Sequence, residues 1–304
     1  FAEWDGTVAV DGTALQVSKR GNPSKKRLRD GSVPEQALMA STPVAGWHHK
    51  ETGDHDGENP EVKGGTYAWG FEATLAAMTG PGFAERGGRP GLILGMGFHR
   101  PGVNPTARLW ESLQNITERP DLPRGYMLFD RLYPTQKPEG MHIPLREEGY
   151  DLVFDYKDKE RGLQAVLPSG AVVIDGGLYS PGINAFPGLV DPHSEYEAGK
   201  IDREKYMARL AGRKKFALAT KGTKNSAGGR RFRCPVKAPG AALSCALVAR
   251  GDEQPTAKDR WVLRVQDVAD FSAAPPAICR QASVTIKNSV EDGARWLQQG
   301  PAYG

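Results

Sequence analysis

Two apolar runs in this sequence each end on an aspartate. Residues 7–11 read TVAVD and residues 125–130 read GYMLFD. A short apolar run predicts a buried strand, and a carboxylate at its end must meet water, a cation or a metal. Together, Asp11 and Asp130 could hold divalent metal ions that activate an attacking oxygen and stabilise a leaving oxygen in phosphodiester chemistry. Because Asp is also favoured in turns, either residue could instead only begin a turn.

The surrounding pattern predicts the elements that must position these carboxylates. We expect strands over 8–17, 66–78, 91–98, 126–130 and 151–156, and a long polar loop over 19–62. This order, with helices between the later strands, predicts an α/β fold with one central mixed sheet. In that sheet Asp11 and Asp130 would lie on neighbouring strands.

Two helices are expected between these strands. Asn104 can cap the first, with Pro105 in its first position and Leu109, Leu113 and Ile116 on one face. The second is expected over 139–148, with Gly149 after its C-terminus.

The character of the chain changes after residue 160, where short apolar runs alternate with Gly and Pro turns. We expect short strands there and one basic helix at about 202–214. The domain prediction therefore has three parts: a core over 1–160 with both aspartate strands, a mostly β, basic insertion lobe over 161–290, and a return to the core over 291–304.

Positive charge is concentrated in one part of the chain. The net charge is +4, yet residues 200–233 hold twelve Lys or Arg against two acids, so the rest of the chain is acidic overall. A concentrated positive charge favours a polyanion such as DNA or RNA, although a solvated loop and helix face would have the same composition. The predicted DNA-binding residues are Arg213, Lys214, Lys215, Arg230, Arg231 and Arg233. Phe232 could stack on a base between these arginines, or the run could be an ordinary surface strand.

Composition sets further bounds. Hydrophobic residues make up 39% of the 304 residues, which is enough for a hydrophobic core. Three cysteines do not make a disulfide framework. The sequence has no apolar run of 18 residues, so we expect no membrane span, and its first residues lack the pattern of a signal peptide. A cytoplasmic location is the expectation. Because the chain starts at Phe1 and ends without a closing helix, we expect it to be part of a longer reading frame.

Two further groups of residues have the composition of binding sites. The histidines at 48, 49 and 55, with acids at 54 and 56, could bind a metal or line an active site, or could be a plain polar loop. Gly95-Met96-Gly97 has the start of a dinucleotide-binding pattern, but its third Gly is missing.

Several runs of the sequence resemble DDE-type transposases of bacterial insertion sequences. The run at 8–13 resembles the strand of the first catalytic aspartate, and the run at 125–133 resembles that of the second with its following turn. Residues 145–157, and residues 46–56 followed by 67–71, are also similar to that family. The resemblance covers most of the chain and is strongest over 5–180.

The resemblance implies an RNase H-like catalytic fold interrupted by a β-rich insertion. It implies that Asp11 and Asp130 hold Mg²⁺ (or Mn²⁺) for cleavage and strand transfer at transposon ends. The implied partners are transposon-end and target DNA and a second copy of the chain in a synaptic complex, in the cytoplasm at the bacterial nucleoid. The third acid of the family is a Glu on a helix after the insertion. Glu291 and Asp292 lie in a short polar segment, so we expect that acid beyond Gly304.

Two other functions stay open at this point. The missing third acid fits a catalytically inactive, transposon-derived DNA-binding remnant. A phosphohydrolase with Asp11 as its nucleophile would need a second Asp two residues later, where Thr13 stands.

Overall fold

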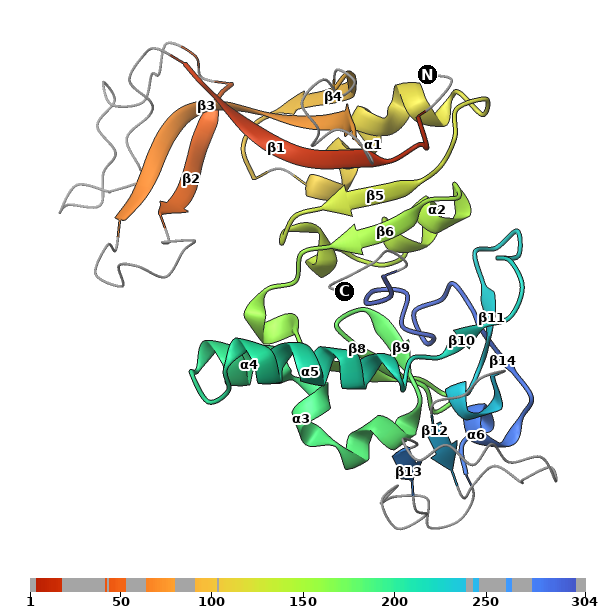
Figure 1. Cartoon of the computed structure of the whole chain (residues 1–304). Helices are drawn as coiled ribbons and strands as arrows, with labels where there is room; N and C mark the ends of the chain where they lie inside the picture. The colour runs from red at the N-terminus through yellow and green to blue at the C-terminus, as the bar shows by residue number, and fades with distance from the viewer. Residues whose placement is uncertain are drawn as a thin grey trace, which may run out of the picture. The chain divides into compact units, whose positions relative to one another are not determined.

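The computed structural model describes residues 4–17, 42, 44–52, 64–79, 91–102, 104–238, 243–245, 261–263 and 275–298. The chain is mixed α/β and divides into two compact units, Phe1–Pro123 (unit 1) and Arg124–Gly304 (unit 2) (Figure 1). The predicted α/β class is therefore confirmed. The division falls at residue 123, whereas the sequence placed a boundary at 160.

Unit 1 contains an antiparallel sheet built around one long strand. Its strands are β1 (Val8–Gln16), β2 (Gly46–Thr52), β3 (Gly64–Met78) and β4 (Ile93–His99). The long strand β3 pairs with β2 along its first half and with both β1 and β4 along its second half. Because β2 lies within 19–62, the prediction of a continuous loop there is wrong. The run GWHHKET has no apolar alternation to reveal the strand, which depends on hydrogen bonding to β3.

Two glycines allow helix α1 (Pro105–Thr117) to lie directly on β4. A methyl group at Gly95 would lie 2.0 Å from the carbonyl oxygen of Ser112, and one at Gly97 would lie 2.9 Å from that of Arg108. Both contacts are too short for any side chain, so only glycine permits this close approach of helix and strand. Gly95 and Gly97 therefore have a packing role in β4.

The start of α1 agrees with the sequence prediction. Pro105 is its first residue, and the side-chain oxygen of Asn104 accepts a hydrogen bond from the N–H of Ala107 at 3.2 Å. Leu109, Leu113 and Ile116 are all buried, as their spacing predicts.

Asn104→Ala is expected to lower the free energy of unfolding by about 1 kcal/mol, because the variant removes a helix cap. The φ of Asn104 is 25°, a left-handed value that Asn adopts more readily than Ala. Urea denaturation would measure the change. Asn104→Asp keeps an acceptor oxygen and is the matched control. An equal loss of stability in both variants would contradict the capping role.

Unit 2 begins with two parallel strands, β5 (Tyr126–Phe129) and β6 (Asp151–Phe154), joined through helix α2 (His142–Glu147). The helix starts three residues later than predicted, because residues 137–141 form hydrogen-bonded turns first. Gly149 follows it with a φ of 101°, the left-handed conformation that the sequence predicted for this position.

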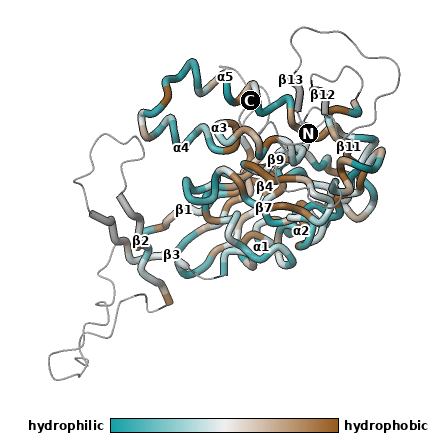
Figure 2. Tube along the Cα trace, turned by 90° about the horizontal axis from the view of Figure 1, so that it is seen from below, coloured by the Kyte–Doolittle hydropathy of each residue, from teal (hydrophilic) through white to brown (hydrophobic). Residues whose placement is uncertain are grey.

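The rest of unit 2 has small sheets and short helices. The strands are β7 (Leu163–Val166), β8 (Val172–Ile174), β9 (Gly177–Tyr179), β10 (Ala219–Thr220), β11 (Arg230–Arg233), β12 (Leu243–Cys245), β13 (Trp261–Leu263) and β14 (Val284–Ile286). The helices are α3 (Pro187–Val190), α4 (Pro192–Glu197), α5 (Arg203–Lys214) and α6 (Ala277–Arg280). Strands β7, β8 and β9 form one antiparallel sheet and β10, β11 and β14 another, while β12 and β13 form a parallel pair. The basic helix predicted at 202–214 is α5, capped by the Asp202 side chain and largely hydrophilic in Figure 2.

Strand β8 has buried side chains on both of its faces. Val173 packs in a cluster with Phe232 of β11, whereas Val172 and Ile174 pack in a second cluster with Phe216 after α5. A strand that is buried on both faces holds two cores together, so β8 is the centre of packing in this part of unit 2.

One buried arginine joins α2 to the segment 288–298. The Arg146 guanidinium is 2% exposed and donates to the carbonyl oxygens of Ala294 at 2.6 Å and Leu297 at 2.5 Å. Burial lowers the pKa of Arg146 to about 10, which leaves it charged at neutral pH. The Tyr156 hydroxyl also donates to the carbonyl of Trp296. The chain after β14 thus packs against α2 and the end of β6.

Candidate functional site

Asp11 lies where β1 leaves the buried core. Val8 and Val10 are buried, and every residue of β1 from Asp11 onward is exposed. The Asp11 carboxylate accepts a hydrogen bond from the N–H of Gly12 at 2.7 Å. A carboxylate oxygen has lone pairs beyond this one bond, so Asp11 can both order its own backbone and bind a cation.

Asp130 follows the buried strand β5, as the sequence predicted. Its side chain is exposed, and one carboxylate oxygen accepts from the N–H of Leu132 at 3.0 Å. This is a turn hydrogen bond, so the turn-forming role of the aspartate is present.

Asp155 is a second carboxylate at the same end of this strand pair. It directly follows β6, and its N–H donates to the carbonyl oxygen of Phe129 at 3.1 Å, which continues the parallel ladder. Its carboxylate accepts from the Arg131 guanidinium at 2.7 Å. Carboxyl ends of parallel strands are where open α/β sheets place their ligands. Asp155 was not among the predicted site residues, although it directly follows the apolar run at 152–154, just as Asp11 and Asp130 follow theirs.

Asp11 belongs to unit 1 and Asp130 to unit 2. Each occupies the exposed position after buried strand residues that the sequence analysis assigned to it. Their convergence on shared metal ions stays a prediction.

Arg213 has a structural role inside unit 2, so its side chain is not exposed for the DNA contact that the sequence predicted. The side chain is 5% exposed, and its guanidinium donates to the Asp175 carboxylate at 2.5 Å and to the carbonyl oxygens of Leu189 at 2.8 Å and Val190 at 3.0 Å. All of its nitrogens are therefore used inside unit 2. The basic composition of α5 did not reveal which face of the helix is buried. Lys214, on the same helix, is exposed, and Lys215 is partly buried.

The arginines of β11 are placed differently from its phenylalanine. Arg231 is exposed and Arg230 and Arg233 are partly buried, whereas Phe232 is 9% exposed and packs in the core. Phe232 therefore cannot stack on a base as the sequence suggested. The Arg231 guanidinium donates to the Ser283 hydroxyl at 3.0 Å.

Arg231 lines an open groove of about 860 Å³ in unit 2. Lys287 and the hydroxyls of Ser283 and Thr285 share this groove, with Glu291 and Asp292 also in its lining. Two cations with neighbouring hydroxyl groups are the donors that commonly bind phosphate oxygens. Asp292 already accepts from the N–H of Lys287 at 2.8 Å, so it shapes the turn after β14.

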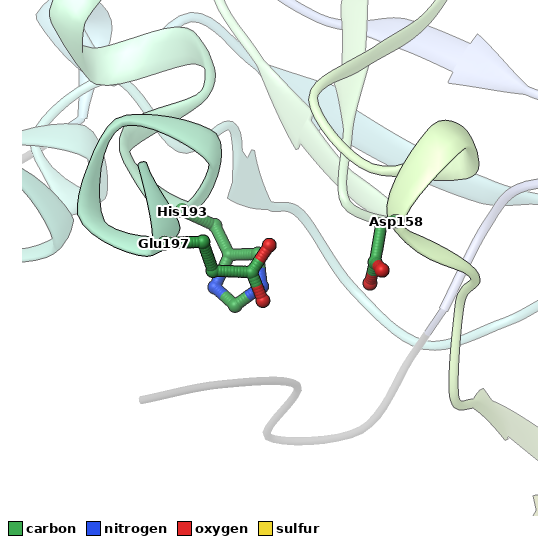
Figure 3. A group of neighbouring side chains, drawn as sticks. All are labelled: Asp158, His193 and Glu197. Carbon is green, nitrogen blue, oxygen red and sulfur yellow. The ribbon is translucent and has the colours of Figure 1, made fainter. Parts of the chain in front are cut away.

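A third group was not singled out by the sequence analysis. His193 and Glu197 lie one turn apart on α4, and Asp158 comes from the short 3₁₀ helix Asp158–Glu160 (Figure 3). One ligand atom of each residue lies within 4.8 Å of the other two. The spacing of four residues between His193 and Glu197 was the available sequence signal, but the approach of Asp158 depends on tertiary structure.

The histidine group at 48–56 is only partly described. His48 is partly buried in β2, whereas Asp54, His55 and Asp56 lie outside the described residues. Among the described residues, no helix is long and apolar enough to cross a membrane. Comparisons of the chain with models of protein families, with curated proteins and with solved structures found no match.

Proposed function

We propose that this chain is the catalytic part of a DDE-type transposase, with an RNase H-like core and a β-rich insertion. The observation that carries the proposal is the exposed Asp130 carboxylate at the carboxyl end of a buried strand, beside a parallel strand that also ends on an aspartate. Asp11, at the exposed end of the buried part of β1, supplies the second proposed ligand.

These residues fit a hard divalent cation. Carboxylate oxygens are the ligands that Mg²⁺ prefers, and Mg²⁺ keeps several waters, so two or three carboxylates suffice. When bound, the metal ions would supply Lewis-acid activation of an oxygen nucleophile and charge neutralisation at the phosphate. The chain itself orients Asp130 through the Leu132 N–H and Asp11 through the Gly12 N–H. Arg131, held against Asp155, adds a positive charge at the same strand ends.

The alternative is a DNA-binding remnant without catalytic activity. This alternative is supported by the positions of Glu291 and Asp292, the two acids that were considered above for the third catalytic acid. Asp292 accepts from a backbone N–H in a turn, and Glu291 lies next to it in the same turn, so neither projects from a helix.

Incubation of the purified protein with supercoiled plasmid separates the two functions. The transposase proposal expects nicking in Mg²⁺ or Mn²⁺ and none in EDTA. DNA binding without nicking in any metal would favour the remnant. Nicking that persists in EDTA would contradict metal-dependent chemistry, and the absence of DNA binding would contradict both functions.

Arg231→Gln is expected to weaken DNA binding and to reduce the slope of log affinity against log salt by about 1, because one phosphate contact is lost. Fluorescence anisotropy at several salt concentrations would measure the slope. Arg119→Gln is the matched control, since Arg119 is an exposed arginine of unit 1 whose guanidinium is paired with Asp121. An unchanged slope in Arg231→Gln would remove the groove from the proposed DNA interface.

A further inference from the structure

We propose that Asp158, His193 and Glu197 bind a transition-metal ion of the Zn²⁺ class, separately from the Mg²⁺ ions proposed for Asp11 and Asp130. The ligand set supports this choice. One imidazole nitrogen with two carboxylate oxygens suits Zn²⁺ and its neighbours, whereas Mg²⁺ prefers oxygen ligands alone. Three protein ligands would leave a fourth position for water.

The spacing of the three ligand atoms is close to that of a metal site. Tetrahedral Zn²⁺ with ligands at about 2.1 Å places neighbouring ligand atoms about 3.4 Å apart. Here His193 Nε2 lies 2.6 Å from a Glu197 oxygen, and all three atoms lie within 4.8 Å of one another. Small rotations of exposed carboxylates would therefore complete the geometry. Figure 3 shows the His193 and Glu197 side chains together, with the Asp158 carboxylate across from them.

The position of the His193 ring supports the site. Its Nε2 atom is shielded from solvent and lies 2.6 Å from a Glu197 oxygen, so this nitrogen faces the carboxylate and not the solvent. A neutral imidazole nitrogen in such a position has a lone pair that a metal ion between the three residues would bind.

The element that carries two of the ligands is held firmly. The Asp191 carboxylate caps α4 by accepting from the N–H and the hydroxyl of Ser194, at 3.1 and 2.6 Å. The His193 ring packs near that of Tyr206 on α5, with 6.2 Å between ring centroids. A ligand helix that is already ordered loses little entropy when an ion binds.

Arg161 is a neighbouring cation that would compete with a bound metal ion for Asp158. Arg161 Nε lies 3.8 Å from an Asp158 oxygen, a distance that gives only a weak interaction for an exposed carboxylate. An ion at this site would tie the 3₁₀ helix at 158–160 to α4. Because Asp158 lies three residues after Asp155, the ion would brace the segment that leaves the end of β6.

Zn²⁺ titration of the EDTA-treated, dialysed protein by isothermal calorimetry tests the proposal. We expect Asp158→Asn and His193→Ala each to weaken one Zn²⁺ site by at least about tenfold. Asp158 is exposed, so this variant remains informative if His193→Ala fails to fold. Co²⁺ added in place of Zn²⁺ should give a visible absorption band that the same variants lose.

Two controls make the result specific. Glu195→Gln alters α4 outside the cluster, in a residue paired with Arg209, and should leave Zn²⁺ binding unchanged. His55→Ala should also leave this site intact. The proposal is overturned if the wild-type protein binds no Zn²⁺, or if His55→Ala abolishes binding while Asp158→Asn and His193→Ala do not. Because none of these residues belongs to the proposed catalytic set, DNA nicking is scored separately.

Discussion

Asp130→Asn is expected to reduce metal-dependent DNA nicking by about 10³-fold, equivalent to about 4 kcal/mol of transition-state stabilisation. This result rests on the proposed function. The neutral amide is a poorer ligand for Mg²⁺ than a carboxylate, but its oxygen can still accept the hydrogen bond from the Leu132 N–H. The substitution therefore removes charge and leaves the turn after β5 in place.

The measurement is the initial nicking rate with excess protein, together with DNA affinity in Ca²⁺. DNA affinity should stay within about twofold of wild type. Asp121→Asn is the matched control, because Asp121 is an exposed aspartate in unit 1 that pairs with Arg119. Nicking by Asp130→Asn at the wild-type rate would show that a contaminating nuclease or another site is responsible, and Asp130 would lose its catalytic assignment.

Acidification from pH 6.5 to pH 4 is expected to reduce the free energy of unfolding by about 3 kcal/mol through His142 alone. The side chain is fully buried at the start of α2, and its pKa is lowered to about 4 by burial first and by the charge of Arg146 second. The unfolded chain takes up a proton below pH 6.5, whereas the folded protein does so only near pH 4. The stabilisation is therefore complete above pH 6.5 and is lost as the pH falls through this window.

His142→Gln removes this titration with little change in shape. The His142 Nε2 lies 3.2 Å from the carbonyl oxygen of Tyr133, and the amide nitrogen of Gln can donate to the same oxygen. Urea denaturation at pH 7, 6, 5 and 4 gives the free energy of unfolding of wild type and variant. In the difference between the two proteins, the contributions of the other titrating groups largely cancel. Parallel pH profiles for wild type and variant would contradict the role of His142.

Local sequence signals predicted the elements of this chain whose stability depends on local contacts. Asn104 and Pro105 mark the start of α1 through hydrogen bonds within one turn, and the left-handed Gly149 marks the end of α2. Strand β2 was missed because its pairing partner β3 begins twelve residues after it ends, and its own residues alternate no apolar side chains. Short elements such as β9 and α4 lack the length that periodicity requires.

The candidate site residues also divide into those with a local sequence signal and those that depend on tertiary structure. Asp11 and Asp130 could be found because each ends an apolar run in the sequence itself. The sequence alone gave no means to separate the buried Arg213 from the exposed Lys214, since that choice depends on which face of α5 packs against Leu189 and Asp175. The meeting of Asp158 with His193 likewise joins elements 35 positions apart, with no local pattern to announce it.

The hydrogen bonds of the Arg146 guanidinium determine which contacts of unit 2 can form only late in synthesis. Its carbonyl partners at Ala294 and Leu297 come 148 and 151 residues later in the chain. At about 5–20 residues per second, a ribosome needs about 7–30 s to add that stretch. Throughout this interval α2 holds a charge whose final partners have not been made, so it must remain hydrated. Final closure of unit 2 therefore waits for the arrival of residues 294–297, and synthesis that stops before them would leave α2 exposed to chaperones and proteases.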